Sequence, residues 1–164
     1  MKYALIGCGR IAVNHMKAAI NNKLEIVAVC DVLPEKMEAL LEKYDLQNDP
    51  SIKRYTDYKQ MLAENDITLA SIATESGIHA QIALYCIDHG VNVIIEKPMA
   101  MSMDDAEEIV RRSLNACGSP CDGCNGCGNA GGGRIDAIYQ PYIDGEKELA
   151  DINAEYAASR KLIR

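Results

Sequence analysis

The stretch GCGRIA at residues 7–12 decides the fold that the sequence predicts. It follows an apolar run at residues 3–6 and opens an amphipathic stretch at residues 11–21, so it stands at a strand-to-helix turn. Its spacing is that of the G-x-G-x-x-G/A fingerprint of dinucleotide-binding folds, with alanine in the third position. Gly7 permits the tight turn, and Gly9 lets the backbone approach a pyrophosphate at the helix N-terminus. A tight strand-to-helix turn that binds no ligand is the alternative interpretation.

Outward from this stretch, apolar runs alternate with amphipathic ones. The runs that predict buried strands are residues 3–6, 26–30, 69–73 and 91–95. The stretches that predict helices are residues 11–21, 34–43, 58–64, 78–88 and 104–115. The last helix has Ser102 as its N-cap and Asp105 three positions later, a form of capping box. This alternation predicts the α/β class: a doubly wound parallel sheet, or Rossmann fold, with helices on both faces.

Length and composition exclude several classes of protein. The chain has 164 residues, 48% of them hydrophobic and 25% charged, enough for one domain and a tail. A formal net charge of −7 argues against nucleic acid as a partner, because phosphate-backbone binding needs clustered Lys and Arg. No run is apolar enough for a membrane span or a signal segment. Since no export signal accompanies the seven cysteines, we expect a cytoplasmic protein with free thiols or metal-bound ones.

The character of the sequence changes near Cys117. Residues 117–133 hold four cysteines and seven of the chain's twelve glycines, a composition that builds no packed core. The predicted parts are a dinucleotide-binding domain at 1–115, a Cys/Gly-rich flexible segment at 116–133 and a helical tail at 134–164. Within the tail, we expect a turn at residues 144–145 and a helix at residues 146–162.

Four cysteines of this segment have the spacing of metal ligands. Cys117, Cys121, Cys124 and Cys127 are separated by three, two and two residues, the reverse of the bacterial ferredoxin run. Four thiolates at such spacing are able to hold an iron–sulfur cluster or Zn²⁺. The segment lacks the apolar neighbours that bury a cluster, so a flexible thiol-rich segment without metal is the favoured interpretation. A metal protein that carries electrons is the alternative.

Asp31 supports a dinucleotide site. It follows the predicted strand 26–30, about twenty residues after the fingerprint, where a carboxylate accepts hydrogen bonds from the adenosine ribose. An acid there repels a 2′-phosphate, and its neighbour Val32 offers no positive charge, so we predict NAD rather than NADP. A helix cap is the alternative role for an Asp at the end of a strand.

Two further groups of polar residues follow predicted strands. Thr74 and His79 come after one apolar run, and Glu96 and Lys97 come after the next. Ligands of open α/β sheets bind beyond the carboxyl ends of the strands, so both groups are expected near the ligand. A lysine there can hold a sugar hydroxyl, stabilise alkoxide charge and assist proton transfer once burial lowers its pKa. The alternatives are a solvated loop around Lys97 and a helix cap at His79.

Three stretches together carry a family resemblance. They are ALIGCGRIAVNH at 4–15, VAVCDV at 27–32 and SIATESGIHAQIALYCIDHGVNVIIEKPMAMS at 71–102. In this order they resemble the glucose-fructose oxidoreductase, inositol dehydrogenase and rhizopine-catabolism family (Gfo/Idh/MocA), over residues 1–113. Within that family, they look most like dehydrogenases of UDP-N-acetylhexosamine-type nucleotide sugars.

The resemblance implies a role for each predicted site residue. Gly7, Gly9, Arg10 and Ile11 would contact the dinucleotide, Asp31 the ribose, and Thr74 and His79 the nicotinamide side, while Lys97 would assist catalysis and Glu96 would border cofactor and substrate. The implied activity is NAD-dependent hydride transfer between a sugar hydroxyl carbon and nicotinamide, with a sugar or nucleotide-sugar substrate and homo-oligomers as an expected assembly. His15 and His89 receive no site role: His15 is interpreted as structural or surface.

The resemblance stops near residue 113. Family members continue into a second half that supplies an antiparallel sheet, the substrate pocket and an Asp and His pair, and nothing after residue 115 resembles it. The sequence therefore favours a truncated sugar dehydrogenase. An NAD-binding module or inactive fragment without its own catalysis is the alternative.

Overall fold

The computed structural model describes residues 1–115, 141, 145–148, 150–152 and 154–155. The chain divides into two units, Met1–Gly118 and Ser119–Arg164. The boundaries between the three predicted parts stay a prediction, because residues 116–140 lie outside the described residues. Among the helices that the structure describes, none has the length and hydropathy needed to cross a membrane.

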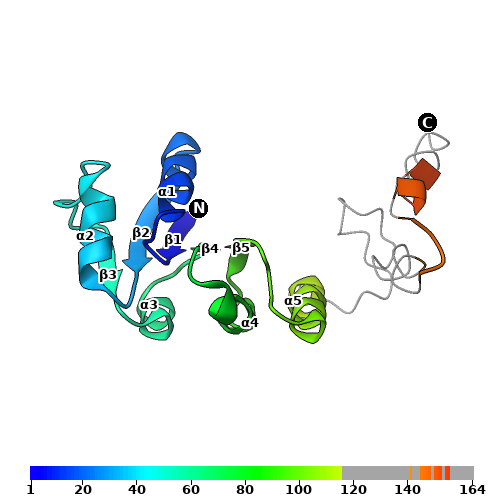
Figure 1. Ribbon diagram of the computed structural model, residues 1–164. Coiled ribbons are helices and arrows are strands. Elements are labelled where there is room, and N and C mark those ends of the chain that lie inside the picture. Colours follow the sequence, from blue (N-terminus) through cyan, green and yellow to red (C-terminus); the bar gives the residue numbers. More distant parts are fainter. Residues whose placement is uncertain (116–140, 142–144, 149, 153, 156–164) are drawn as a thin grey trace. The chain divides into compact units, whose positions relative to one another are not determined.

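The first unit is built on a parallel sheet of five strands, in the order β3-β2-β1-β4-β5 (Figure 1). The strands are β1 (Lys2–Ile6), β2 (Glu25–Cys30), β3 (Lys53–Tyr55), β4 (Leu69–Ile72) and β5 (Asn92–Ile95). The helices are α1 (Ala12–Asn21), α2 (Pro34–Glu42), α3 (Tyr58–Glu64), the short 3₁₀ helix η1 (Ser76–Ile78), α4 (His79–Asp88) and α5 (Met103–Asn115). The strand order reverses between β1 and β4, which confirms the predicted doubly wound Rossmann class and places a crevice at their carboxyl ends.

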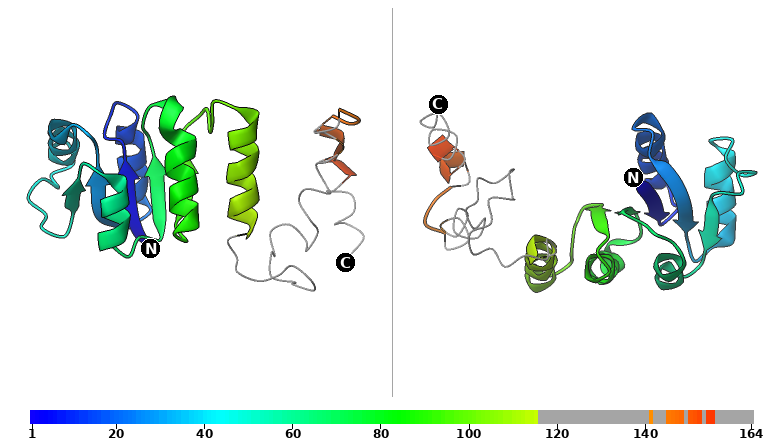
Figure 2. Two further views of the ribbon diagram at one scale, coloured as in Figure 1. Left: turned by 90° about the horizontal axis from the view of Figure 1, so that it is seen from below. Right: turned by 180° about the vertical axis from the view of Figure 1, so that it is seen from behind.

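Two helical layers cover the sheet, because successive side chains of β1 point to opposite faces. Tyr3 and Leu5 are buried with residues of α1 and α2, whereas Ala4 and Ile6 are buried with residues of α3, α4 and α5. The view from behind shows the same two layers (Figure 2). The crevice is therefore bordered by α1 on one face of the sheet and by α4 on the other.

The predicted elements of the first unit are present with ends that differ by at most one residue. The predicted cap of α5 also forms: the Asp105 N–H donates to Ser102 Oγ at 3.1 Å, and Ser102 Oγ donates to Asp105 Oδ2 at 2.8 Å. Strand β3 is not among the predicted strands. It has three residues at the edge of the sheet, two of them Lys53 and Arg54, so it lacks the apolar run that marks a buried strand.

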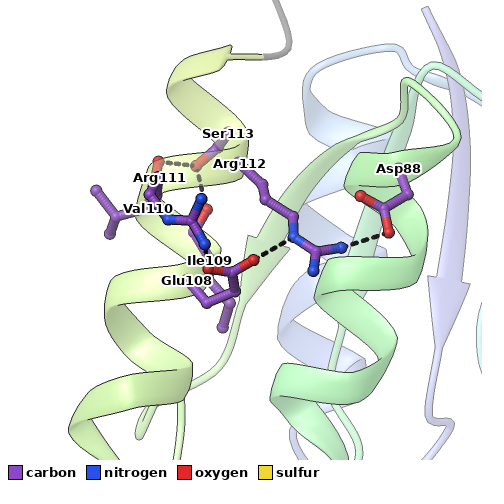
Figure 3. Close-up of polar contacts among 7 residues, drawn as sticks. All are labelled: Asp88, Glu108, Ile109, Val110, Arg111, Arg112 and Ser113. Atoms are coloured by element: carbon purple, nitrogen blue, oxygen red, sulfur yellow. Dashed lines mark hydrogen bonds and ion pairs between the residues drawn. The ribbon is translucent and has the colours of Figure 1, made fainter.

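Helix α5 packs on α4 through apolar and ionic contacts. Ile109 is 3% exposed and belongs to the core on that face. Arg112 joins the two helices, since its guanidinium donates to Glu108 on α5 at 2.5 Å and to Asp88 on α4 at 2.6 Å (Figure 3). Because these ionic groups are partly exposed, burial of Ile109 contributes more than the ion pairs of Arg112 to holding α5 on α4.

In the second unit, the predicted helix at 146–162 begins later than expected. Residues 146–148 are not helical, whereas residues 150–152 and 154–155 are. The N–H groups of Glu146 and Lys147 both donate to the Pro141 carbonyl, at 2.8 and 3.0 Å. These two residues, where the helix was predicted to begin, thus belong to a turn that is closed by Pro141. The predicted turn is present at Gly145, whose φ is +71°.

Candidate functional site

A cleft of about 730 Å³ lies where β1, β2 and β4 end. We call it the glycine-loop cleft, and its lining includes Gly7, Gly9, Arg10, Ile11, Asp31, Val32, Lys36, Tyr58, Thr74 and Glu75. The structure thus brings together six of the predicted site residues. Lys36 and Tyr58 were not predicted, because neither is part of a motif and the topology alone brings α2 and α3 to this crevice.

The fold itself requires glycine at position 7, independently of any ligand. Its φ is +92°, and a Cβ built on it would lie 2.6 Å from both the carbonyl carbon and the oxygen of Ala73. Its N–H donates to the Cys30 carbonyl at 2.8 Å, and the Ala73 N–H donates to the Ile6 carbonyl at 2.7 Å. Only glycine therefore lets β1 turn while it stays in register with β2 and β4.

Gly9 differs, because nothing in the protein lies within 4 Å of a Cβ built there. The glycine at this position leaves open space in the glycine-loop cleft, which a larger side chain would fill. Helix α1 begins three residues later with no side-chain cap and no acidic residue in its first turn. Open space beside an uncapped helix N-terminus fits a pyrophosphate group, so the residues present fit a dinucleotide.

Asp31 holds two loops together at the edge of this cleft. Its Oδ2 accepts a hydrogen bond from the Cys8 N–H at 2.8 Å, and its Oδ1 accepts one from the Leu33 N–H at 3.0 Å. The second bond closes a local turn before α2, whose N-cap is Leu33 without a side-chain cap, so Asp31 does not have the alternative cap role. Each carboxylate oxygen has a further lone pair, so these bonds leave Asp31 able to accept from a ribose hydroxyl.

A second cleft adjoins the first. We call it the Lys97 cleft, and its lining is Ile11, Thr74, Ser76, His79, Glu96, Lys97 and Pro98. Ile11 and Thr74 line both clefts, so the two form one continuous site. The side chain of Lys97 is exposed, and the described residues do not supply the burial expected for it.

His79 lies in the wall of the Lys97 cleft with only 1% of its surface exposed. Its Nδ1 lies 2.8 Å from the Pro98 carbonyl oxygen, and its Nε2 lies 3.0 Å from the Thr74 carbonyl oxygen. Both ring nitrogens therefore contact the backbone of the loops that follow β4 and β5. The role of His79 on the nicotinamide side stays a prediction.

His15 contacts a residue of the Lys97 cleft although sequence reasoning gave it no site role. Its Nε2 lies 2.8 Å from Glu96 Oε1, and the two side chains are 12% and 28% exposed. The available signal was helical spacing: His15 follows Ile11 by four residues, which puts both on the face of α1 toward the crevice.

Within the described part of the chain, no cysteine or group of metal ligands adds a reactive group to this site. Cys8, Cys30 and Cys86 are buried free thiols, and burial raises the pKa of each to about 12. Cys8 packs in the core beneath the glycine loop. The described residues contain no group of His, Cys, Asp and Glu able to hold a metal ion, and Cys117, Cys121, Cys124 and Cys127 lie outside them.

Comparison with known proteins supports a nucleotide-binding site. Residues 1–114 match the model of the Gfo/Idh/MocA oxidoreductase family with its NAD-binding Rossmann fold. The WlbA dehydrogenase from Chromobacterium violaceum, solved with NADH and UDP-GlcNAcA, is 32% identical with a TM-score of 0.63. That match covers 71% of this chain and 33% of the dehydrogenase.

Two curated relatives show how much of a longer protein this chain spans. Inositol 2-dehydrogenase of Salmonella typhimurium is 28% identical over 112 residues, which are 67% of this chain and 32% of that enzyme. Glycosyl hydrolase family 109 protein 1 of Bacteroides fragilis is 37% identical over 93 residues, 54% of this chain and 20% of that protein. The chain spans a fifth to a third of the length of these relatives. One is named as a dehydrogenase and the other as a glycosyl hydrolase, so their names indicate different reactions.

Proposed function

The chain belongs to the Gfo/Idh/MocA oxidoreductase family through its NAD-binding Rossmann domain, and on this basis we propose that it takes part in hydride transfer between NAD(H) and a sugar. The observation that carries the proposal is the continuity of the two clefts through Ile11 and Thr74. A dinucleotide with its pyrophosphate at Gly9 would extend along this surface toward Lys97.

The residues of this chain would act in sequence along the site. The loop N–H groups that follow Cys8 and the N-terminus of α1 would hold the pyrophosphate, and Asp31 would accept from the adenosine ribose. NAD, when bound, supplies the hydride acceptor or donor. Lys97 would donate a hydrogen bond to the reacting hydroxyl, stabilise the alkoxide charge and exchange the proton.

For the substrate we propose a cyclic polyol, a sugar or a nucleotide sugar. Support comes from the relatives, one of which is an inositol dehydrogenase and another a dehydrogenase solved with UDP-GlcNAcA. Most of the length of these relatives has no counterpart in the matched part of this chain. Among the described residues, those of the Lys97 cleft are the ones we expect the substrate to touch.

A second candidate function is an NAD-binding module that performs no reaction of its own. Support for it is that the family model matches this chain through an NAD-binding Rossmann fold, which binds the cofactor whether or not a reaction follows. Both candidates share the cofactor site and differ in turnover alone.

Calorimetric titration of the chain with NADH and NADPH tests the cofactor site first. We expect saturable binding that prefers NADH, and a Gly9→Ala variant as control should bind it more weakly. Incubation with NAD and either myo-inositol or UDP-GlcNAcA, followed at the absorbance of NADH, then separates the candidates. NADH formation that a Lys97→Met variant loses supports the dehydrogenase, whereas binding without turnover supports the module.

We also propose a reducing, cytoplasmic location and a homo-oligomeric state. The seven cysteines support the location, because three of them are buried as free thiols. Sedimentation velocity of the purified chain, over a range of concentrations, tests the assembly.

A further inference from the structure

Lys97 stands between two residues that are each held by a histidine. On its N-terminal side, the Glu96 N–H extends the sheet by donating to the Ile72 carbonyl at 3.0 Å, and its carboxylate meets His15 Nε2 at 2.8 Å. On its C-terminal side, the Pro98 carbonyl meets His79 Nδ1 at 2.8 Å. Lys97 itself is exposed, so its position depends on what fixes these two neighbours.

The two histidines come from opposite faces of the sheet. His15 lies on α1, whose buried residues pack with the α2 face, and His79 begins α4 on the other face. The Nε2 of His79 lies 3.0 Å from the Thr74 carbonyl oxygen, and because a neutral imidazole carries one N–H, the ring donates to one of the two carbonyls. The segment that carries Lys97 is thus held from α1 through His15 and from α4 through His79.

We propose that His15 and His79 are positioning residues that aim Lys97 along the cleft it shares with Ile11 and Thr74. The inference rests on the proposed function, because it assigns Lys97 a place beside the bound nicotinamide. The physical reason is that a long, exposed lysine side chain samples many rotamers, and fixing its backbone on both sides restricts where the ammonium can reach. Neither histidine needs to touch cofactor or substrate.

Isosteric amides separate this role from a general effect on folding. The amide nitrogen of glutamine reaches the place of a histidine Nε2, and that of asparagine the place of Nδ1. His15 uses Nε2 toward Glu96, so His15→Gln keeps the contact and His15→Asn loses it. His79 uses Nδ1 toward Pro98, so the pattern reverses: His79→Asn keeps that contact and His79→Gln loses it.

The readout is protection of Lys97 from acetylation by saturating NADH, quantified by mass spectrometry of the Lys97 peptide. In the unmodified chain NADH should slow acetylation of Lys97, and the protection should fall about tenfold in His15→Asn and His79→Gln, as expected for loss of a charge-assisted or buried hydrogen bond. His15→Gln and His79→Asn should retain most of it. Lys59, on α3, serves as the internal control, and thermal unfolding of each variant monitors the fold.

The outcomes are distinct. Equal protection in both members of each amide pair overturns the proposal, because side-chain polarity rather than the contact to the Lys97 segment would then matter. Absent protection in the unmodified chain, with NADH bound in calorimetry, also overturns it. Absent NADH binding in calorimetry refutes the proposed cofactor site instead, and so is distinguishable from a failure of the positioning role.

Discussion

The carboxylate of Asp31 accepts a 2.8 Å hydrogen bond from the backbone N–H of Cys8, a residue 23 positions earlier in the chain. The bond joins the end of β2 to the glycine loop after β1, so the residue expected to read the ribose also fixes the loop expected to hold the pyrophosphate. Replacing Asp31 therefore changes both the shape and the charge of the glycine-loop cleft. Cofactor preference isolates the charge, because loop shape affects NADH and NADPH alike.

We expect Asp31→Ser to raise the affinity for NADPH relative to NADH by roughly tenfold or more, because it removes a negative charge beside the 2′ position. Lys36 lines the same cleft and would then face the 2′-phosphate. Calorimetric dissociation constants for the two cofactors, compared as a ratio, provide the measurement. In the double variant with Lys36→Gln the gain should disappear, and a ratio unchanged from that of the unmodified chain would exclude the ribose role of Asp31.

Gly7 and Gly9 should respond oppositely to alanine. Gly7→Ala forces a Cβ to 2.6 Å from the Ala73 backbone at a φ of +92°, so we expect the free energy of unfolding to fall by about 2–4 kcal/mol. Gly9→Ala meets no protein atom, so stability should change by less than about 1 kcal/mol while NADH affinity drops. Urea unfolding and calorimetry on the two variants provide the measurements. Unchanged NADH affinity in a folded Gly9→Ala protein would argue against pyrophosphate at this position.

Local signals were sufficient for most of the fold. The apolar runs and the glycine fingerprint predicted four strands within one residue, because buried parallel strands carry apolar side chains on both faces. Strand β3 was not predicted, because it is an edge strand of three residues in which only Tyr55 is buried and Lys53 is exposed to solvent. Its partner in the sheet is set by tertiary contacts that leave no periodic pattern.

The site residues, too, divide into those that a local motif predicts and those that only tertiary contacts bring together. Gly7, Gly9 and Asp31 could be predicted because each is part of a motif with a fixed spacing. The contact of His15 with Glu96 spans 81 residues and depends on tertiary folding that brings α1 to the residue after β5, which no short pattern encodes. The late start of the helix after Gly145 was not predicted, because it follows from a local turn in which the Pro141 carbonyl accepts hydrogen bonds from two N–H groups.

The buried thiols should make stability fall at alkaline pH. Burial raises the pKa of Cys8, Cys30 and Cys86 from 9.0 to about 12, so the folded state disfavours their thiolates. A raised pKa contributes stability that is complete below pH 9.0 and is lost as pH rises toward about 12. Urea unfolding at pH 8, 9 and 10 should show this decline, and a Cys86→Ala variant should reduce its slope. A stability that rises over this range would contradict the burial of these groups as thiols.

The same pKa values predict slow alkylation of the native protein. At pH 8 the thiolate fraction of a group with a pKa of about 12 is roughly a thousandfold below that of one at 9.0, and the thiolate is the nucleophile. Iodoacetamide should therefore modify the peptides that contain these three cysteines far more slowly in buffer than in urea. Modification of Cys8 at equal rates in both would show that the glycine loop opens readily.

Helix α5 should depend on its buried isoleucine more than on its ion pairs. Ile109 is 3% exposed, so Ile109→Ala should lower the free energy of unfolding by about 2–4 kcal/mol. Arg112 links Glu108 and Asp88 from a position 40% exposed, so Arg112→Gln should cost less than about 1 kcal/mol, and less still at high salt (Figure 3). Urea unfolding at low and high sodium chloride distinguishes the two contributions. A loss in Arg112→Gln as large as that in Ile109→Ala would mean that the bridge to Asp88, rather than the core, holds α5 against α4.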